Sequence, residues 1–241
     1  MILRDLHVHT TYCDGINTPE EMVLAAIQKG MECLGFSAHS YTFFDQSYCM
    51  TKADDYKHEI ARLKEKYKDK IKILCGVEQD FYSEEPTDGY DYVIGSVHYI
   101  KIDKNYIPVD ESAQILIDAA NKYFGGDFYK LADTYYKTVA QIKNADIIGH
   151  FDLITKFNED FCLFDENDER YEKSYKDALD ALLRQDVYFE INTGAISRGY
   201  KKAPYPSKNI LDYIKSGGGK TILSSDSHSI DGLLFQFEKY S

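Results

Sequence analysis

The chain has 241 residues, of which 44% are hydrophobic, so it can bury one sizeable core, and we expect a single domain over residues 1–241. Its net charge of −12 argues against binding of long nucleic acid, which needs a basic surface. No run of about 18 apolar residues occurs, so no membrane span is predicted. Five cysteines without a CxxC pair, and an opening MILRDLHVHT unlike a signal peptide, favour a cytoplasmic protein.

Short apolar runs alternate with helical stretches along the chain. The first strand is predicted over residues 2–6, and a helix opens at Thr18-Pro19-Glu20-Glu21, where Thr18 and Glu21 form a capping box and Gly30 ends the helix. Further strands are expected over residues 31–36, 71–77, 92–97, 146–149, 187–191 and 221–223. Further helices are expected over residues 54–70, 111–124, 128–143, 170–185 and 207–216.

This alternation is typical of parallel βα units in an α/β fold. Seven such strands within one domain suggest a closed or nearly closed barrel. An open, doubly wound sheet is the alternative. No GxGxxG sequence follows a strand, so a dinucleotide-binding fold lacks support.

Six of the seven histidines lie at or just beyond the carboxyl end of a predicted strand, the edge where parallel α/β folds place their active sites. They are His7, His9, His39, His98, His150 and His228. The remaining His58 lies mid-helix among charged residues, and we expect it at the surface. Glu78 and Asp226 also follow strands.

Two pairs, His7 with His9 and Asp226 with His228, have i, i+2 spacing, which puts both side chains on one face of an extended segment. Each pair can therefore chelate one ion, and imidazole with carboxylate suits Zn, Mn or Fe(II). Burying so many imidazoles together without a cation would be costly. The sequence therefore predicts a site for two or three divalent metal ions.

Two further residues have two readings each. Asp14 precedes Gly15 and serves either a turn or a metal. Arg198 lies just beyond the stretch 187–193, which contains Glu190 and Asn192, and is either a surface arginine or a group that binds a phosphate with two nitrogens.

The ordered motifs resemble the polymerase and histidinol phosphatase (PHP) superfamily, and in particular its histidinol-phosphatase branch. They are His7-Val8-His9-Thr10, Asp14-Gly15, Ser37-Ala38-His39, Gly76-Val77-Glu78, Gly95-Ser96-Val97-His98, Gly149-His150-Phe151-Asp152 and Ser225-Asp226-Ser227-His228. The resemblance runs from residue 2 to about residue 228. It implies a distorted seven-stranded (β/α) barrel with a trinuclear metal site.

By this resemblance, three sets of residues bind metal: His7, His9, Glu78 and Asp226; Glu78, His98 and His150; and Asp14, His39 and His228. A metal-bridging water held at the first set would be the nucleophile. Many superfamily members have histidine where Asp14 stands. The implied reaction is hydrolysis of L-histidinol phosphate in histidine biosynthesis, with Arg198 on the phosphate and Asn192 as a second substrate contact.

Other activities remain open at this point. A PHP phosphoesterase acting on nucleotides or another small phosphate ester would use the same ions. An amidohydrolase-like deaminase or lactonase also uses HxH on its first strand, but it usually adds a metal-binding lysine after a mid-barrel strand, and no lysine of this sequence convincingly occupies such a place. A purely structural metal site is usually rich in sulfur. The chain stops soon after His228, which leaves barrel closure either to a neighbouring molecule or to a compact variant of the fold.

Overall fold

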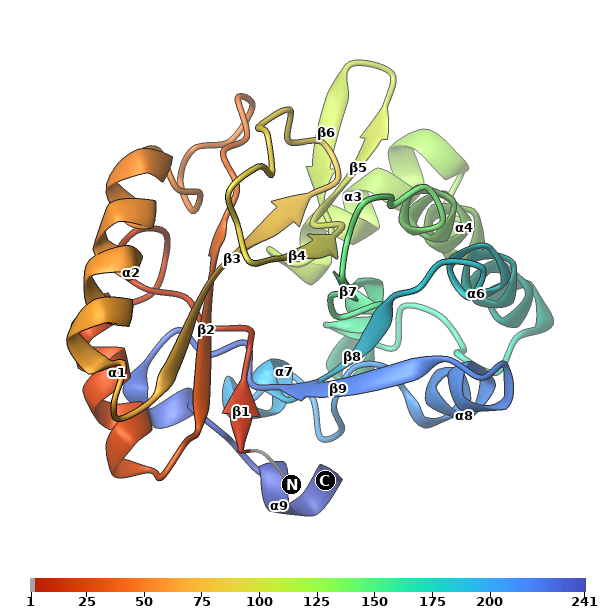
Figure 1. The fold of residues 1–241 in the computed structure, drawn as a ribbon. Helices are drawn as coiled ribbons and strands as arrows, with labels where there is room; N and C mark the ends of the chain where they lie inside the picture. The colour runs from red at the N-terminus through yellow and green to blue at the C-terminus, as the bar shows by residue number, and fades with distance from the viewer. Residues whose placement is uncertain (1–2) are drawn as a thin grey trace.

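The computed structural model describes residues 3–241, so Ile2 of the first predicted strand lies outside it. Seven strands form one sheet in the order β1-β2-β3-β4-β7-β8-β9, and every neighbouring pair is parallel (Figure 1). The strands are β1 (Arg4–Asp5), β2 (Cys33–His39), β3 (Lys72–Asp80), β4 (Tyr92–Ser96), β7 (Ile147–Ile148), β8 (Tyr188–Asn192) and β9 (Lys220–Ser224).

The sheet curls until its first and last strands meet. Just beyond β1 and β9, Val8 and Ser227 form a parallel bridge: the amide of His9 donates to the Ser227 carbonyl at 2.8 Å, and the amide of Ser227 donates to the His7 carbonyl at 3.0 Å. The predicted nearly closed barrel is therefore confirmed, and the open doubly wound alternative is wrong. The closing bridge lies within this chain, at the carboxyl edge of the sheet.

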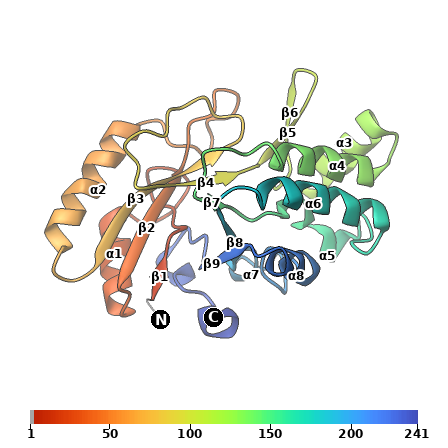
Figure 2. The ribbon, with the colours of Figure 1, turned by 45° about the vertical axis from the view of Figure 1, so that its right-hand side comes forward.

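Helices cover the outside of the barrel, with α1 and α2 on one side and α3, α4, α6 and α8 on the other (Figure 2). The helices are α1 (Pro19–Gln28), α2 (Ala53–Tyr67), α3 (Ala113–Phe124), α4 (Phe128–Val139), α5 (Asn158–Phe161), α6 (Glu169–Leu182), α7 (Gly194–Ser197), α8 (Lys208–Ser216) and α9 (Phe237–Tyr240), with 3-10 turns η1 (Leu153–Thr155) and η2 (Ile230–Gly232). The predicted capping box of α1 is present: Thr18 Oγ1 accepts from the Glu21 amide, and the Glu21 carboxylate accepts from the Thr18 amide. Among residues 3–241, no helix is both long and apolar enough to cross a bilayer.

Several strand and helix ends differ from prediction: α2 ends at Tyr67 rather than at residue 70, α4 ends at Val139 rather than at residue 143, and the strand expected over residues 146–149 is reduced to β7. β2 and β3 each run three residues further than expected, to His39 and Asp80, because polar residues continue the strands into the barrel mouth. The hairpin of β5 (Tyr99–Ile102) and β6 (Asn105–Pro108) was not predicted. Its turn uses Asp103 at a φ of 56° without the adjacent glycine that signals such turns in a sequence.

Inside the barrel, the ring of one buried tyrosine, Tyr92, lies below the polar side chains of the carboxyl edge. Tyr92 is buried, and its hydroxyl donates to the carbonyls of Leu6 at 2.7 Å and Phe36 at 2.9 Å. Gly76 makes room for this ring, since a Cβ there would lie 2.3 Å from Tyr92 Cζ. The strands are thereby held together below the carboxyl edge, and the polar side chains above that level face one another.

Candidate metal centre

Nine side chains predicted as metal ligands converge at the carboxyl edge of the barrel. They are His7 and His9 after β1, Asp14 in the next loop, His39 at the end of β2, Glu78 in β3, His98 after β4, His150 after β7, and Asp226 and His228 after β9. His58, excluded by the sequence reasoning, is exposed on α2. Residues distant in sequence are thus gathered by the parallel strands alone.

Glu78 lies at the centre of this cluster, fully buried, with imidazole nitrogens around both carboxylate oxygens. Oε2 lies 3.1 Å from His7 Nε2, 3.4 Å from His9 Nε2 and 2.9 Å from His39 Nδ1, and Oε1 lies 2.9 Å from His150 Nε2 and 3.4 Å from His98 Nε2. Burial alone would raise the pKa of Glu78, but the surrounding imidazoles outweigh it and hold the pKa well below its ordinary value. A carboxylate in this position can bridge two ions.

Four buried atoms of the predicted ligands have no hydrogen-bond partner within the described chain: His7 Nε2, His9 Nε2, Glu78 Oε2 and His150 Nδ1. The first three face one another. Desolvated lone pairs without a donor are unfavourable, and a cation between them removes the penalty. Imidazole and carboxylate ligands suit Zn, Mn and Fe, so the residues present fit divalent metal ions.

The charged groups around His7 also favour a cation at this centre. Burial lowers its pKa, but Glu190, Glu78 and Asp226 outweigh that effect and raise the pKa well above its ordinary value. The site therefore favours a positive charge at His7, which a metal ion supplies in place of a proton. For His9, burial and the nearby His228 and His39 lower the pKa to about 3, which keeps this imidazole neutral and able to bind metal.

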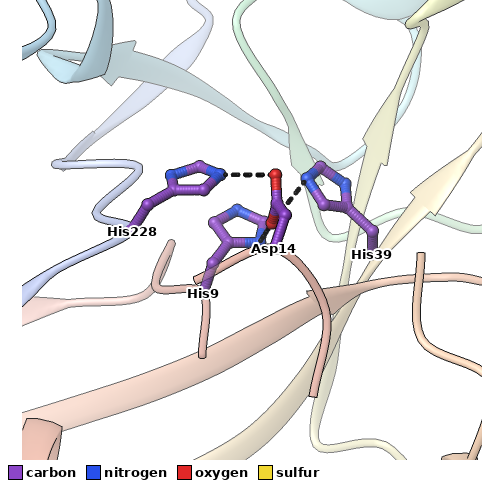
Figure 3. A group of neighbouring side chains, drawn as sticks. All are labelled: His9, Asp14, His39 and His228. Atoms are coloured by element: carbon purple, nitrogen blue, oxygen red, sulfur yellow. Dashed lines mark hydrogen bonds and ion pairs between the residues drawn. The ribbon is translucent and has the colours of Figure 1, made fainter. Parts of the chain in front are cut away.

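A second group of donors forms at the mouth of the barrel. Asp14 lies between His228 and His39, with His9 beside it (Figure 3). Asp14 Oδ2 is 3.1 Å from His228 Nε2, and Oδ1 is 3.6 Å from His39 Nε2 and 3.7 Å from His9 Nδ1. The His9 ring stacks on those of His39 and His228, with centroids 4.3 and 4.2 Å away. Donor atoms of Asp14, His9, His39 and His228 all lie within 4.8 Å of one another, so these four side chains could share one ion.

Residues 5–194 match the profile of the PHP domain family over most of the chain. This chain belongs to the PHP domain family. A probable histidinol-phosphatase of Schizosaccharomyces pombe is 30% identical over 240 residues, which cover 87% of this chain and 74% of the relative. The buried donor cluster and the family together make this protein a metal-dependent phosphoesterase of the PHP type.

Solved structures share the fold of this PHP domain. A candidate histidinol phosphatase of Listeria monocytogenes has a TM-score of 0.84 at 21% identity, covering 99% of this chain and 100% of that one. The histidinol phosphate phosphatase of Lactococcus lactis subsp. lactis, solved with zinc, L-histidinol and phosphate, has a TM-score of 0.71 at 24% identity, covering 95% of this chain and 87% of that one.

Carboxylates behind the histidines orient them, a role that was not predicted from the sequence. Glu190 Oε1 lies 2.6 Å from His7 Nδ1, and Oε2 accepts from the His150 amide at 2.8 Å. Asp80 Oδ2 accepts from the His98 amide at 3.1 Å and lies 3.3 Å from His98 Nδ1. Such partners fix the tautomer and direction of metal-binding histidines. The available signal was spacing, since Asp80 stands two residues after Glu78 and shares its strand face.

Asn192, predicted to contact substrate, is fully buried and engaged within the PHP domain. Its Nδ2 donates to Glu190 Oε2 at 2.8 Å and to Asp226 Oδ2 at 3.3 Å, and its Oδ1 accepts from the Gly194 amide at 2.8 Å. It is absent from the described residues that line the cavity next to the cluster. These contacts are those of a residue that positions Asp226 and Glu190. Substrate contact by Asn192 stays a prediction without support from this geometry.

Arg198 is held at the rim of the cluster. Its Nη1 donates to the Asp226 carbonyl at 2.8 Å and its Nη2 to Asp226 Oδ2 at 3.0 Å. Gly194, at the start of α7, permits this close packing, because a Cβ there would lie 2.9 Å from the Asp226 Cβ. Asp226 itself has a φ of +51°, a strained backbone of the kind found at functional sites.

A cavity of about 330 Å³ opens beside the donor cluster, at the small end of the range for ligand pockets. Its wall includes the ligand candidates Asp14, His39, His98, His150, Asp226 and His228. Away from these, it is lined by carboxylates, two cations and aromatic rings: Asp45, Asp110, Glu111, Lys156, Arg198, Tyr48, Tyr99, Tyr200 and Tyr205. A small ligand in the cavity would therefore contact the cluster, both signs of charge and several ring faces.

Proposed function

We propose that this PHP domain hydrolyses a small phosphomonoester, L-histidinol phosphate, to L-histidinol and phosphate. The observation that carries the proposal is the set of unpartnered buried atoms on His7, His9 and Glu78, beside a cavity that also contains Arg198. Buried lone pairs call for cations, and cations beside a forked guanidinium suit a phosphate group.

In this proposal three sets of residues hold the ions, with Glu78 shared by two of them. The sets are those that the family resemblance implies: His7, His9, Glu78 and Asp226; Glu78, His98 and His150; and Asp14, His39 and His228. The structure supports a multinuclear site with four overlapping groups of nearby donors: His9, Asp14, His39 and His228; His7, His9 and Glu78; His7, His150 and Asp226; and His39, Glu78 and His98. Ions bound there lower the pKa of water toward neutrality and neutralise phosphate charge. The Lactococcus lactis relative contains zinc, which supports zinc among Zn, Mn and Fe. Glu190 and Asp80 hold the imidazoles of His7 and His98 in their ligating directions.

Arg198 binds the phosphate oxygens in this proposal. Its bonds to Asp226 fix the guanidinium at the cavity wall, so little side-chain entropy is lost when a phosphate arrives. Burial lowers the pKa of Arg198, but Asp226 outweighs that effect and the pKa is raised, so the group stays charged. Arg198→Ala is expected mainly to raise KM, and unchanged KM and kcat would remove it from the site.

The carboxylates of the cavity support the finer assignment of substrate. Asp45, Asp110 and Glu111 would face the ammonium and imidazole groups of histidinol. Tyr48 and Tyr99 offer ring faces against which an imidazole can pack. The relatives in Schizosaccharomyces pombe and Lactococcus lactis carry histidinol phosphatase names, and the Lactococcus structure contains L-histidinol and phosphate.

The test combines metal analysis with phosphate release from histidinol phosphate, nucleoside monophosphates and bis(p-nitrophenyl) phosphate. We expect two or three ions per chain and a preference for histidinol phosphate. His9→Ala or Asp226→Asn should abolish turnover and reduce metal content, whereas the control His58→Ala, at an exposed position on α2, should change neither. Full activity after removal of metal by a chelator would contradict metal dependence. A preference for a nucleotide would show that a nucleotide, and not histidinol phosphate, is the substrate.

A further inference from the structure

Tyr205 is held rigidly at the carboxyl end of β8. Its amide donates to the Asn192 carbonyl at 3.0 Å, and the Asn192 amide donates to the Tyr205 carbonyl at 2.7 Å. The side chain is 1% exposed, and its ring meets the His150 ring edge to face, with centroids 6.4 Å apart. Both the backbone and the ring of Tyr205 are therefore fixed relative to the metal centre.

The hydroxyl of Tyr205 is nevertheless buried without a hydrogen-bond partner anywhere in residues 3–241. The other tyrosines that are equally buried all have partners for their hydroxyls: Tyr56 on the Gly76 carbonyl at 2.9 Å, Tyr135 on the Phe151 carbonyl at 3.2 Å, and Tyr136 with Tyr171 at 2.8 Å. A buried hydroxyl without a hydrogen-bond partner destabilises the folded protein. Among these equally buried phenols of residues 3–241, only that of Tyr205 lacks a partner, and its place in the cavity wall makes the hydroxyl available to a ligand.

The cavity beside the metal centre is where that ligand would lie. Tyr205 lines it together with His150, Arg198, Lys156 and Asp110. A phenol carries its proton at neutral pH and can act as a hydrogen-bond donor. A donor that contacts a cluster histidine and stands near Arg198 suits an anionic oxygen.

We propose that Tyr205 is a catalytic residue whose hydroxyl donates a hydrogen bond to a phosphoryl oxygen of the substrate. This inference rests on the proposed phosphatase function and adds a donor that none of the metal-binding motifs contains. The donor is already fixed and desolvated before the substrate arrives, so it need not reorganise as charge shifts on the phosphoryl group. Its contribution is therefore expected to be larger in the transition state than in the bound substrate, and to affect kcat more than KM.

The first variant to test is Tyr205→Phe, in the metal-loaded protein. We expect kcat to fall about 10- to 100-fold for both histidinol phosphate and p-nitrophenyl phosphate, with KM changed less than kcat. Inorganic phosphate should bind more weakly by calorimetry. The melting temperature should stay the same or rise, because the lost hydroxyl bonds to nothing in the free protein. Metal content should be unchanged.

Tyr171→Phe is the matched control, since Tyr171 is equally buried on α6 and its hydroxyl pairs with that of Tyr136. This variant should lower the melting temperature and leave kcat unchanged. If Tyr205→Phe behaves like the control, its hydroxyl is structural and the proposal is wrong. Unchanged kcat and unchanged phosphate affinity in Tyr205→Phe would also overturn it.

Failure of the histidinol phosphate assignment is distinguishable from failure of this inference. If the wild-type protein cleaves p-nitrophenyl phosphate but not histidinol phosphate, the proposed substrate is wrong. The Tyr205→Phe variant is then compared with wild type on p-nitrophenyl phosphate. If neither ester is cleaved, the calorimetric affinity for inorganic phosphate decides. A loss of phosphate affinity in Tyr205→Phe supports the hydrogen bond, and equal affinity refutes it.

Discussion

Glu190 is a buried carboxylate that supports the metal centre from behind, and its replacement by glutamine is a sharp test of the site. Three donors point at it: His7 Nδ1 at 2.6 Å from Oε1, and the His150 amide and Asn192 Nδ2, each 2.8 Å from Oε2. Glu190→Gln keeps the shape of the side chain but turns one of the two acceptor oxygens into an NH2 donor.

Neither orientation of the new amide satisfies all three donors. If its oxygen faces His7, its NH2 group opposes both the His150 amide and Asn192. If its NH2 group faces His7, that imidazole must accept at Nδ1 and carry its proton on Nε2, the atom that faces Glu78. A protonated Nε2 cannot bind metal, so the substitution lowers the affinity for the ion directly.

Removing such a partner typically weakens metal binding about 10- to 100-fold, which is about 1.4–2.7 kcal/mol. The assay is competition for zinc against a chelating indicator, with turnover measured at saturating metal. Glu65→Gln, at an exposed position on α2, is the control and should retain full affinity. Wild-type metal affinity in Glu190→Gln would refute the assignment of His7 as a ligand held through Nε2.

Three further predictions concern backbone packing, capping and surface charge. Gly194→Ala should reduce turnover at least about 10-fold by displacing Asp226, which a new Cβ would meet at 2.9 Å, and wild-type kcat would contradict this. Thr18→Ala removes the α1 cap and should lower stability by about 1 kcal/mol, or about 2–4 °C in a thermal melt, whereas an unchanged melt would mean that the cap contributes nothing. Hydrogen bonds from Lys66, Tyr67 and Arg62 lower the pKa of Glu20 to about 2, so its stabilising contribution is complete above its ordinary pKa and disappears as pH falls through about 2. The difference in melting temperature between wild type and Glu20→Gln should therefore shrink from pH 6 to pH 2, and a constant difference would count against the ion pairs.

Much of the fold and of the donor set follows from the sequence alone. Strand runs, the Thr18 cap and the i, i+2 pairs His7–His9 and Asp226–His228 are local patterns, and they predict both the barrel and the edge where ligands gather. This works because parallel strands bring all their carboxyl ends to one side, so a position along a strand already implies a place in space.

Only the tertiary structure decided which of these residues are candidate metal ligands and which position those ligands. Glu190 and Asn192 lie on one strand, yet hydrogen bonds from distant elements make them supports for His7 and Asp226. The unpartnered hydroxyl of Tyr205 is visible only when every neighbour of that side chain is known. Local patterns record which face a residue occupies, whereas the satisfaction of a buried polar atom depends on groups far away in the chain.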